Sequence, residues 1–173
     1  MVMKKVILSN MGKQTEYADS CDWKAPKIEH KREKAKAQKS TIYKHKGNFK
    51  WSGVKTEKYK HNSRGWSAIV RNVLIGDHGE TCKFHLRYFE IQPNGYSSLE
   101  RHNHEHVVVC IRGKGKVLMG EKFYTIKYLD TIYIAPNTVH QLSNPYDEPF
   151  GFFCIVNAKR DKPKEVRSKN KKK

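Results

Sequence analysis

Short segments rich in β-branched and aromatic residues recur along the chain from residue 66 onward. They span residues 66–76, 82–91, 105–113, 116–120, 122–127, 130–136 and 150–158, and Gly, Pro, Asn or Asp residues bound each one. Short strands that follow one another at spacings of about ten residues, with turn residues between them and no helical period, are typical of antiparallel sandwiches and barrels. The pattern therefore predicts an all-β domain.

The first 60 residues follow no such pattern. They carry 16 Lys and Arg residues against 6 acidic ones, and segment 26–40 has helix formers without the apolar stripe of a packed helix. Near the end of this region stand Phe49, Trp51, Val54 and Tyr59. These apolar residues indicate an arm that packs on the β domain.

The positive charge of the chain lies at its two ends. The formal net charge is +18, of which residues 61–158 contribute only +1 and residues 159–173 contribute +7. The final residues, RSKNKKK, have the composition of a disordered segment. We therefore expect a basic N-terminal arm (1–60), a β-barrel domain (61–158) and a basic disordered tail (159–173).

Several classes of protein are disfavoured by composition. No apolar run reaches the ~7–15 residues of a secretory signal or the ~18 of a membrane span. The four cysteines are dispersed, which favours reduced thiols in a cytoplasmic protein without a membrane partner. Lysine-rich arms can bind phosphates by counterion release, but the chain lacks base-reading motifs, so nucleic-acid binding is kept only as an alternative.

Three histidines alternate in the segment ERHNHEHVVVC: His102, His104 and His106. In a β-strand, residues two apart project from the same face, so this spacing predicts three imidazoles side by side. Neutral imidazoles that converge on one point are what a divalent metal ion requires. The alternative interpretation is a histidine-rich edge exposed to water.

A second segment, DTIYIAPNTVHQLSN, strengthens the metal interpretation. An apolar strand ends at Pro136, the chain turns, and His140 begins the next strand. His140 follows His104 by 36 residues. That interval allows two intervening strands to bring His140 back beside the first three histidines.

Together the two segments resemble the signature motifs of the cupins, small β-barrels with a metal ion inside. The first motif of that family has Gly, His-x-His, three or four residues, Glu, six residues and Gly. Here we align Gly95, His102-Asn-His104 and Gly113, and His106 stands where the family usually has its Glu. The second motif aligns with Asp130, Pro136, His140 and Asn144, and the resemblance covers about residues 82–157.

The resemblance implies a single cupin-like jelly-roll barrel, often paired as a homodimer, in which Trp51 and Val54 would suit the contact. It also implies a divalent ion (Mn, Fe, Ni or Zn) held by His102, His104, His106 and His140. If the strand bulges by one residue, Glu105 replaces His106. A neutral ligand set leaves the ion its full charge, which favours binding of anionic or enolate-like oxygen.

Other residues add candidate chemistry. Arg87 is a candidate clamp for a carboxylate or phosphate, and Tyr133 a candidate acid–base group, although each also suits a structural role. We interpret Glu100 and Arg101 as an ion pair at the rim. The expected function is a metal-dependent enzyme acting on a small, anionic substrate. Its chemistry would be Lewis-acid isomerase or lyase chemistry, as in cupins of sulfur salvage, or O2 binding. The alternative is a non-catalytic ligand sensor.

Overall fold

The computed structural model describes residues 39–60 and 65–166. Most of the predicted N-terminal arm, including nearly all of segment 26–40, and residues 167–173 of the predicted tail lie outside the described residues. Within the described ranges, no helix has the length and apolar character needed to cross a membrane.

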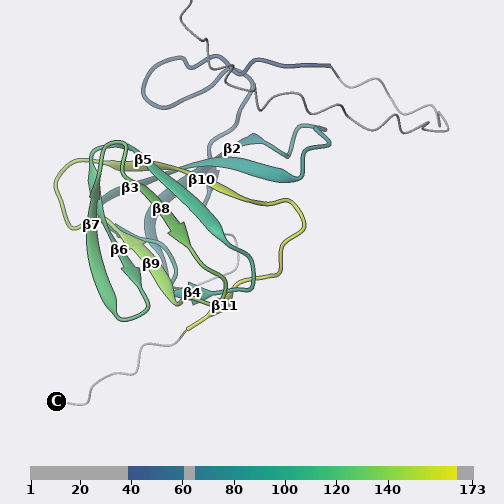
Figure 1. Cartoon of the computed structure of the whole chain (residues 1–173). Helices are drawn as coiled ribbons and strands as arrows, with labels where there is room; N and C mark the ends of the chain where they lie inside the picture. The colour runs from purple at the N-terminus through teal and green to yellow at the C-terminus, as the bar shows by residue number, and fades with distance from the viewer. Residues whose placement is uncertain (1–38, 61–64, 167–173) are drawn as a thin grey trace, which may run out of the picture. The chain divides into compact units, whose positions relative to one another are not determined.

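Every element assigned in the described residues is a β-strand, which confirms the predicted all-β class (Figure 1). The strands are β1 (Glu57–Lys58), β2 (Ser67–Ile75), β3 (Phe84–Tyr96), β4 (Glu100–Arg101), β5 (His106–Arg112), β6 (Lys114–Met119), β7 (Lys122–Lys127), β8 (Thr131–Ile134), β9 (His140–Ser143), β10 (Phe150–Asn157) and β11 (Lys164–Glu165). All seven predicted segments contain a strand.

The strands form one antiparallel sheet with the order β11-β4-β9-β3-β10-β5-β8 (Figure 1). Two branches extend it: β2 pairs with β3, and the β6–β7 hairpin joins through β6 to β9. Strand β3 is the centre of the arrangement, because it pairs with β2, β10 and β9. This order places β4 and β9, which flank the histidine motifs, beside each other.

Alternation along the strands separates an inner face from an outer face. In β5, His106, Val108 and Cys110 are buried, whereas Val107 and Val109 between them are only half-buried. Burial of each large apolar side chain contributes about 1.5–3 kcal/mol relative to exposure. The inner faces therefore supply the core, which includes Ile91, Val117, Ile134, Leu142, Phe150 and Phe152.

Strand β3 is longer than its sequence predicts. The segment Gln-Pro-Asn-Gly was expected to end it at residue 91, yet the strand continues to Tyr96. Asn94 adopts a left-handed φ of 61°, and the register with β2 shifts between Ser67 and Ile69. The turn residues thus form a β-bulge that bends the strand instead of ending it.

Both flanks of the predicted barrel domain pack on it where they are described. The Phe49 ring stacks on Tyr88 with 5.2 Å between ring centroids, and Trp51 contacts Tyr88 and Phe153. Trp51 thus packs on the barrel as expected of the arm, so this residue, which would also suit a contact with a second subunit, is engaged within its own chain. Over residues 159–166 the structure differs from the disordered tail we expected, because β11 pairs with β4.

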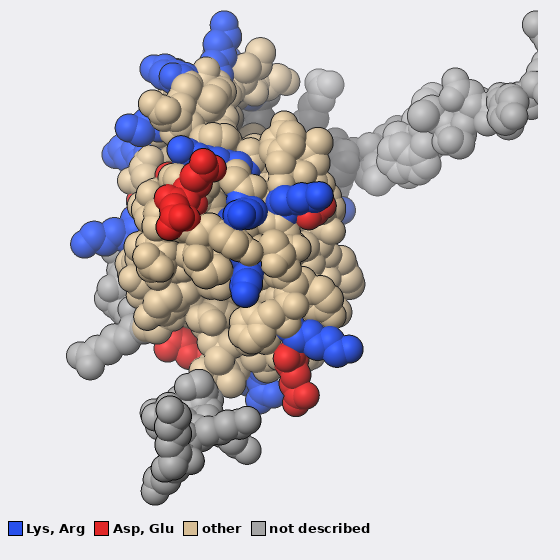
Figure 2. Space-filling view, turned by 90° about the vertical axis from the view of Figure 1, so that its left-hand side faces the viewer, with Lys and Arg blue, Asp and Glu red and all other residues tan. Residues whose placement is uncertain are grey.

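The surface of the described barrel carries charges of both signs. On the face shown in Figure 2, lysine and arginine side chains lie among carboxylates and do not form a single positive patch. This mixture agrees with the net charge of +1 over residues 61–158.

Candidate metal centre

The first three histidines do not share one strand, contrary to the prediction. Only His106 belongs to β5, whereas His102 and His104 lie in the loop between β4 and β5. The Nδ1 atom of His102 lies 2.7 Å from the backbone oxygen of His104 within this loop. We call residues 102–105 the histidine loop.

Three imidazole rings nevertheless meet inside the barrel. The ring centroids of His102, His106 and His140 are 4.4–5.2 Å apart, and one nitrogen of each lies within 4.8 Å of the others. All three side chains are buried. His140 reaches the group because β9 pairs with β4, where His140 lies opposite Glu100.

Hydrogen bonds fix the orientation of two of these rings. The Nδ1 atoms of His102 and His140 lie 2.7 and 2.8 Å from the backbone oxygens of His104 and Thr138. A carbonyl oxygen only accepts, so each Nδ1 carries the proton and each Nε2 presents a lone pair. The Nε2 atom of His102 is buried and has no hydrogen-bond partner among the described residues. A ring held in this way fits a metal ion as its missing partner.

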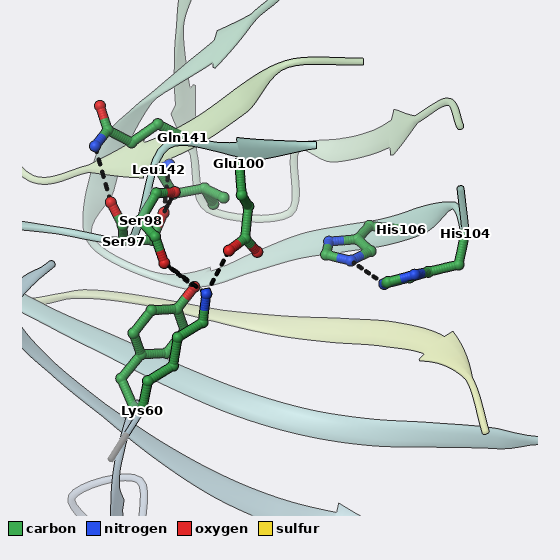
Figure 3. A network of polar contacts seen from close by, with 9 residues as sticks. Lys60, Ser97, Ser98, Glu100, His104, His106, Gln141 and Leu142 are labelled. Carbon is green, nitrogen blue, oxygen red and sulfur yellow. Dashed lines mark hydrogen bonds and ion pairs between the residues drawn. The ribbon is translucent and has the colours of Figure 1, made fainter. Parts of the chain in front are cut away.

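His104 stands at the edge of this group. Its ring stacks on His102 at 3.7 Å, and its Nε2 lies 3.2 Å from the Nε2 of His106 (Figure 3). Two imidazole nitrogens bound about 2.1 Å from one ion lie about 3.0–3.4 Å apart, so this pair also fits a shared ion. The Nδ1 of His104 contacts Asp161, whose pKa is lowered by hydrogen bonds from the Asn103 N–H and from His104.

Burial keeps the clustered imidazoles neutral. It lowers the pKa of His102, His106 and His140, and the neighbouring histidines lower it further. The Arg87 guanidinium adds to the effect at His106. Neutral imidazole is the form that binds metal ions, so the group is in its ligating state at neutral pH.

A cavity of about 200 Å³ opens beside His104, His106 and His140. One wall is apolar and includes Phe89, Leu142 and Phe152. The remaining wall carries four cationic side chains, Lys60, Arg71, Arg87 and Arg160. Two of these cations are ion-paired, Lys60 with Glu100 and Arg71 with Glu57, so the cavity joins the histidine group to Arg87 and Arg160 as its unpaired cations among the described residues.

The arginines of this wall are incompletely paired, although Arg71 Nη2 donates to Glu57 at 2.7 Å. The Nε atoms of Arg71 and Arg87 are buried without a hydrogen-bond partner among the described residues. Burial lowers the pKa of Arg160, and the nearby Arg87 and Arg71 lower it further. Guanidinium groups crowded in this way repel one another, and an anion bound between them removes that repulsion.

A buried carboxylate stands beside the histidines. Glu100 is only 5% exposed and pairs with the ammonium of Lys60, which also donates to Ser98 Oγ at 2.7 Å (Figure 3). Arg101, which we expected to pair with Glu100 at the rim, is exposed. The rim interpretation was wrong because the partner of Glu100 comes from a segment 40 residues earlier.

Cys154 is a further site residue that the sequence reasoning missed. Its thiol is 2% exposed and lines the cavity from β10. The Sγ atom lies 3.3 Å from Arg87 Nη2 and 3.8 Å from His106 Nδ1. Alternation in β10 was the available signal, because Phe152, Cys154 and Val156 all face inward.

The other candidates divide between the two faces of the barrel. Arg87, the candidate clamp for a carboxylate or phosphate, lines the cavity. Tyr133 is 62% exposed because Ile132 and Ile134 hold the inward positions of β8, so the structure does not place Tyr133 at the site. Glu105 is also exposed, and β5 pairs with β8 without a bulge. Strand alternation thus turns His106, not Glu105, inward.

Comparison with known proteins agrees with this architecture. The cupin domain family matches residues 87–156. A 1-methylthio-D-xylulose 5-phosphate methylsulfurylase of Rhodospirillum rubrum is 40% identical over 116 residues, which cover 66% of this chain and 73% of the relative. The chain belongs to the cupin family.

Two solved cupins have the same fold. A cupin-2 domain protein of Rhodospirillum rubrum superposes with a TM-score of 0.64 at 35% identity, covering 73% of this chain and 84% of that protein. A cupin 2 barrel protein of Rhodopseudomonas palustris gives 0.68 at 33% identity, covering 74% and 88%. The family match spans the three clustered histidines, whereas Lys60, Arg71 and Arg160 lie outside it.

Proposed function

We propose that this cupin is a metal-dependent enzyme that acts on a small phosphorylated substrate of the methylthio-pentulose phosphate type. The observation that carries the proposal is one cavity that joins buried, neutral imidazoles to three guanidinium groups. The 40% identical relative, named for its action on 1-methylthio-D-xylulose 5-phosphate, supports the choice of substrate class.

His102, His106 and His140 would hold the ion, with His104 next to them. Imidazole ligands suit Zn, Fe and Ni, and Mn remains a fourth candidate. When bound, such an ion supplies Lewis-acid polarisation of a carbonyl oxygen. The side chains of the cavity would then have to bind the phosphate, exclude water and transfer a proton.

The arginines bind the phosphate in this proposal. Arg87 and Arg160 offer planar, forked donors that match phosphate oxygens in pairs. At about 200 Å³ the cavity lies below the ~300–1,000 Å³ of pockets for drug-sized ligands, which favours a small substrate. The apolar wall of Phe89, Leu142 and Phe152 is suited to a thioether group.

We assign proton transfer to Cys154. Its Sγ atom lines the cavity and lies 3.3 Å from Arg87 Nη2, next to the proposed phosphate clamp. The Sγ atom would take the proton from the carbon next to the substrate carbonyl and return it later. Glu100 is not assigned this role because Lys60 already occupies its carboxylate.

The direct test is turnover of 1-methylthio-D-xylulose 5-phosphate in D2O, followed by proton NMR with protein loaded with each of the four ions. We expect deuterium to enter next to the carbonyl and the methylthio signal to change. Arg87→Met should lower kcat/KM about 10–100-fold, the loss expected for one charge-assisted hydrogen bond. Tyr133→Phe, on the outer face, is the control and should keep full activity. No exchange and no turnover with any of the ions would refute the proposal.

We also propose a homodimer, as the family resemblance implies. The outer face of the sheet offers half-buried Val107 and Val109 beside exposed Tyr133, which gives an apolar surface for a second copy. Light scattering after size exclusion tests this, and Val107→Lys should shift the mass to that of a monomer. A wild-type mass of about 20 kDa would contradict it.

The described cysteines favour a reducing compartment such as the cytoplasm. Cys82, Cys110 and Cys154 are all free thiols, and the latter two are buried. Thiols persist in the reducing cytoplasm, whereas secreted proteins tend to form disulfides.

A further inference from the structure

The histidine loop depends on a distant carboxylate. It belongs to no strand, and its N–H groups at Asn103 and His104 donate to the two carboxylate oxygens of Asp161 at 2.9 and 3.1 Å. One of those oxygens also lies 2.7 Å from His104 Nδ1. Asp161 thus accepts three hydrogen bonds from a loop that lies 57–58 positions earlier in the chain.

Hydrogen bonds hold the chain after β10 on both sides of Asp161. On one side, Arg160 donates to the Asn157 carbonyl at 3.1 Å. On the other, Lys164 and Glu165 pair with Arg101 and Glu100 of β4, and the Val166 N–H donates to the Leu99 carbonyl. This segment is therefore held against the strand that leads into the histidine loop.

A carboxylate is the side chain that these contacts require. It accepts at both oxygens and donates at neither, so His104 Nδ1 must carry a proton, and in the neutral ring Nε2 then presents its lone pair toward His106. An asparagine side chain at position 161 would place its NH2 group, a donor, against one of the N–H donors of the histidine loop, and that hydrogen bond would be lost. Because His104 stacks on His102 at 3.7 Å, its orientation also constrains a member of the three-histidine group.

We propose that Asp161 is a positioning residue for the metal centre: it locks the histidine loop and the tautomer of His104, and thereby raises the affinity of the site for its ion. The inference rests on the metal site of the proposed function, but it assigns a role to a residue outside the matched cupin segment. Partners that orient metal-binding histidines typically change metal affinity 10–100-fold when they are removed.

The test measures Zn²⁺ affinity of the full chain at pH 7.5 by competition with a chromogenic chelator. Asp161→Asn should weaken binding about 10–100-fold. Glu165→Gln makes the same chemical change at an exposed position of the same segment and should leave affinity unchanged. A second readout is the Nδ1 proton of His104 in NMR spectra, which should exchange slowly in the wild type and be lost in Asp161→Asn.

A double substitution separates positioning from general destabilisation. If Asp161 acts through His104, then His104→Gln with Asp161→Asn should bind Zn²⁺ no more weakly than His104→Gln alone. Fully additive losses, or an Asp161→Asn variant that binds within twofold of the wild type, would overturn this inference and leave the proposed function intact. A wild-type chain that binds none of Zn²⁺, Fe²⁺, Ni²⁺ and Mn²⁺ would overturn both.

Discussion

The ion pair between Lys60 and Glu100 should stabilise the fold chiefly by neutralising a buried charge. Glu100 is 5% exposed, and the Lys60 side chain is 25% exposed. Removing one partner of a buried pair typically costs about 3–5 kcal/mol, because the other charge is left uncompensated. Water reaches this pair from the Lys60 side, so we expect Lys60→Met to lower the free energy of unfolding by about 2–3 kcal/mol.

The double variant should recover much of this loss. Lys60→Met with Glu100→Gln removes both charges and keeps both side-chain stems. We expect it to lie within about 1 kcal/mol of the wild type, which gives a coupling free energy of at least about 1 kcal/mol. Glu100→Gln alone should cost less than Lys60→Met, because the ammonium that it leaves unpaired is the more exposed group.

Urea unfolding of the metal-free protein, followed by tryptophan fluorescence, measures all four members of this cycle. EDTA keeps ion binding out of the comparison. A coupling free energy below about 0.5 kcal/mol would refute the reasoning, because it would mean that solvent already screens the pair. A Lys60→Met variant as stable as the wild type would refute it as well.

Three further predictions concern the site and the core. Zn²⁺ at about 100 times its dissociation constant should stabilise the fold by about 2.7 kcal/mol and raise the thermal midpoint, an effect that His106→Ala should abolish and Tyr133→Phe should keep. Because His102, His106 and His140 have pKa values below the ~6.5 of the unfolded chain, their contribution to stability is full above that pH and is lost as pH falls. The free energy of unfolding of the metal-free protein should therefore drop between pH 7 and 5, by up to about 1.4 kcal/mol per pH unit for each histidine, and a flat profile would contradict this. Gly115→Ala should cost about 1–3 kcal/mol in urea unfolding, because a Cβ there comes 2.3 Å from the buried Phe150 ring, whereas Lys116→Ala next to it should cost less.

The fold was predictable because it depends on local patterns. Alternation of inward and outward residues, with turn residues at the ends, located every long strand. The two-residue strands β1, β4 and β11 were missed, since two residues show no alternation. The far end of β3 was missed because a bulge and a turn use the same residue types, here Pro93, Asn94 and Gly95.

The candidate site was predictable only in part. We aligned His102 and His104 with the family's His-x-His pair. Counting back from Gly113 gives a different alignment: His106 takes the position of the family's Glu, and His102, separated from it by three residues as in the motif, takes the position of the second histidine. On that count Glu100 takes the position of the first histidine and His104 lies between ligand positions, in agreement with the three-histidine group. The partners of the site, Lys60, Arg71 and Asp161, come from distant segments, and no local pattern marks them.

The division between the matched segment and its flanks has a consequence for how such barrels diverge. Residues 87–156 contain the clustered histidines, whereas two of the three cavity arginines and the carboxylate that steadies the histidine loop lie before or after that stretch. If the proposed roles hold, exchanging the ends of the chain changes both the preferred ligand and the affinity for the ion, while the three clustered histidines stay in place. Grafting the flanks of one barrel onto another would then be a direct way to change ligand selectivity. A protein trimmed to the matched cupin segment would lose the flanking arginines that are proposed to select the ligand.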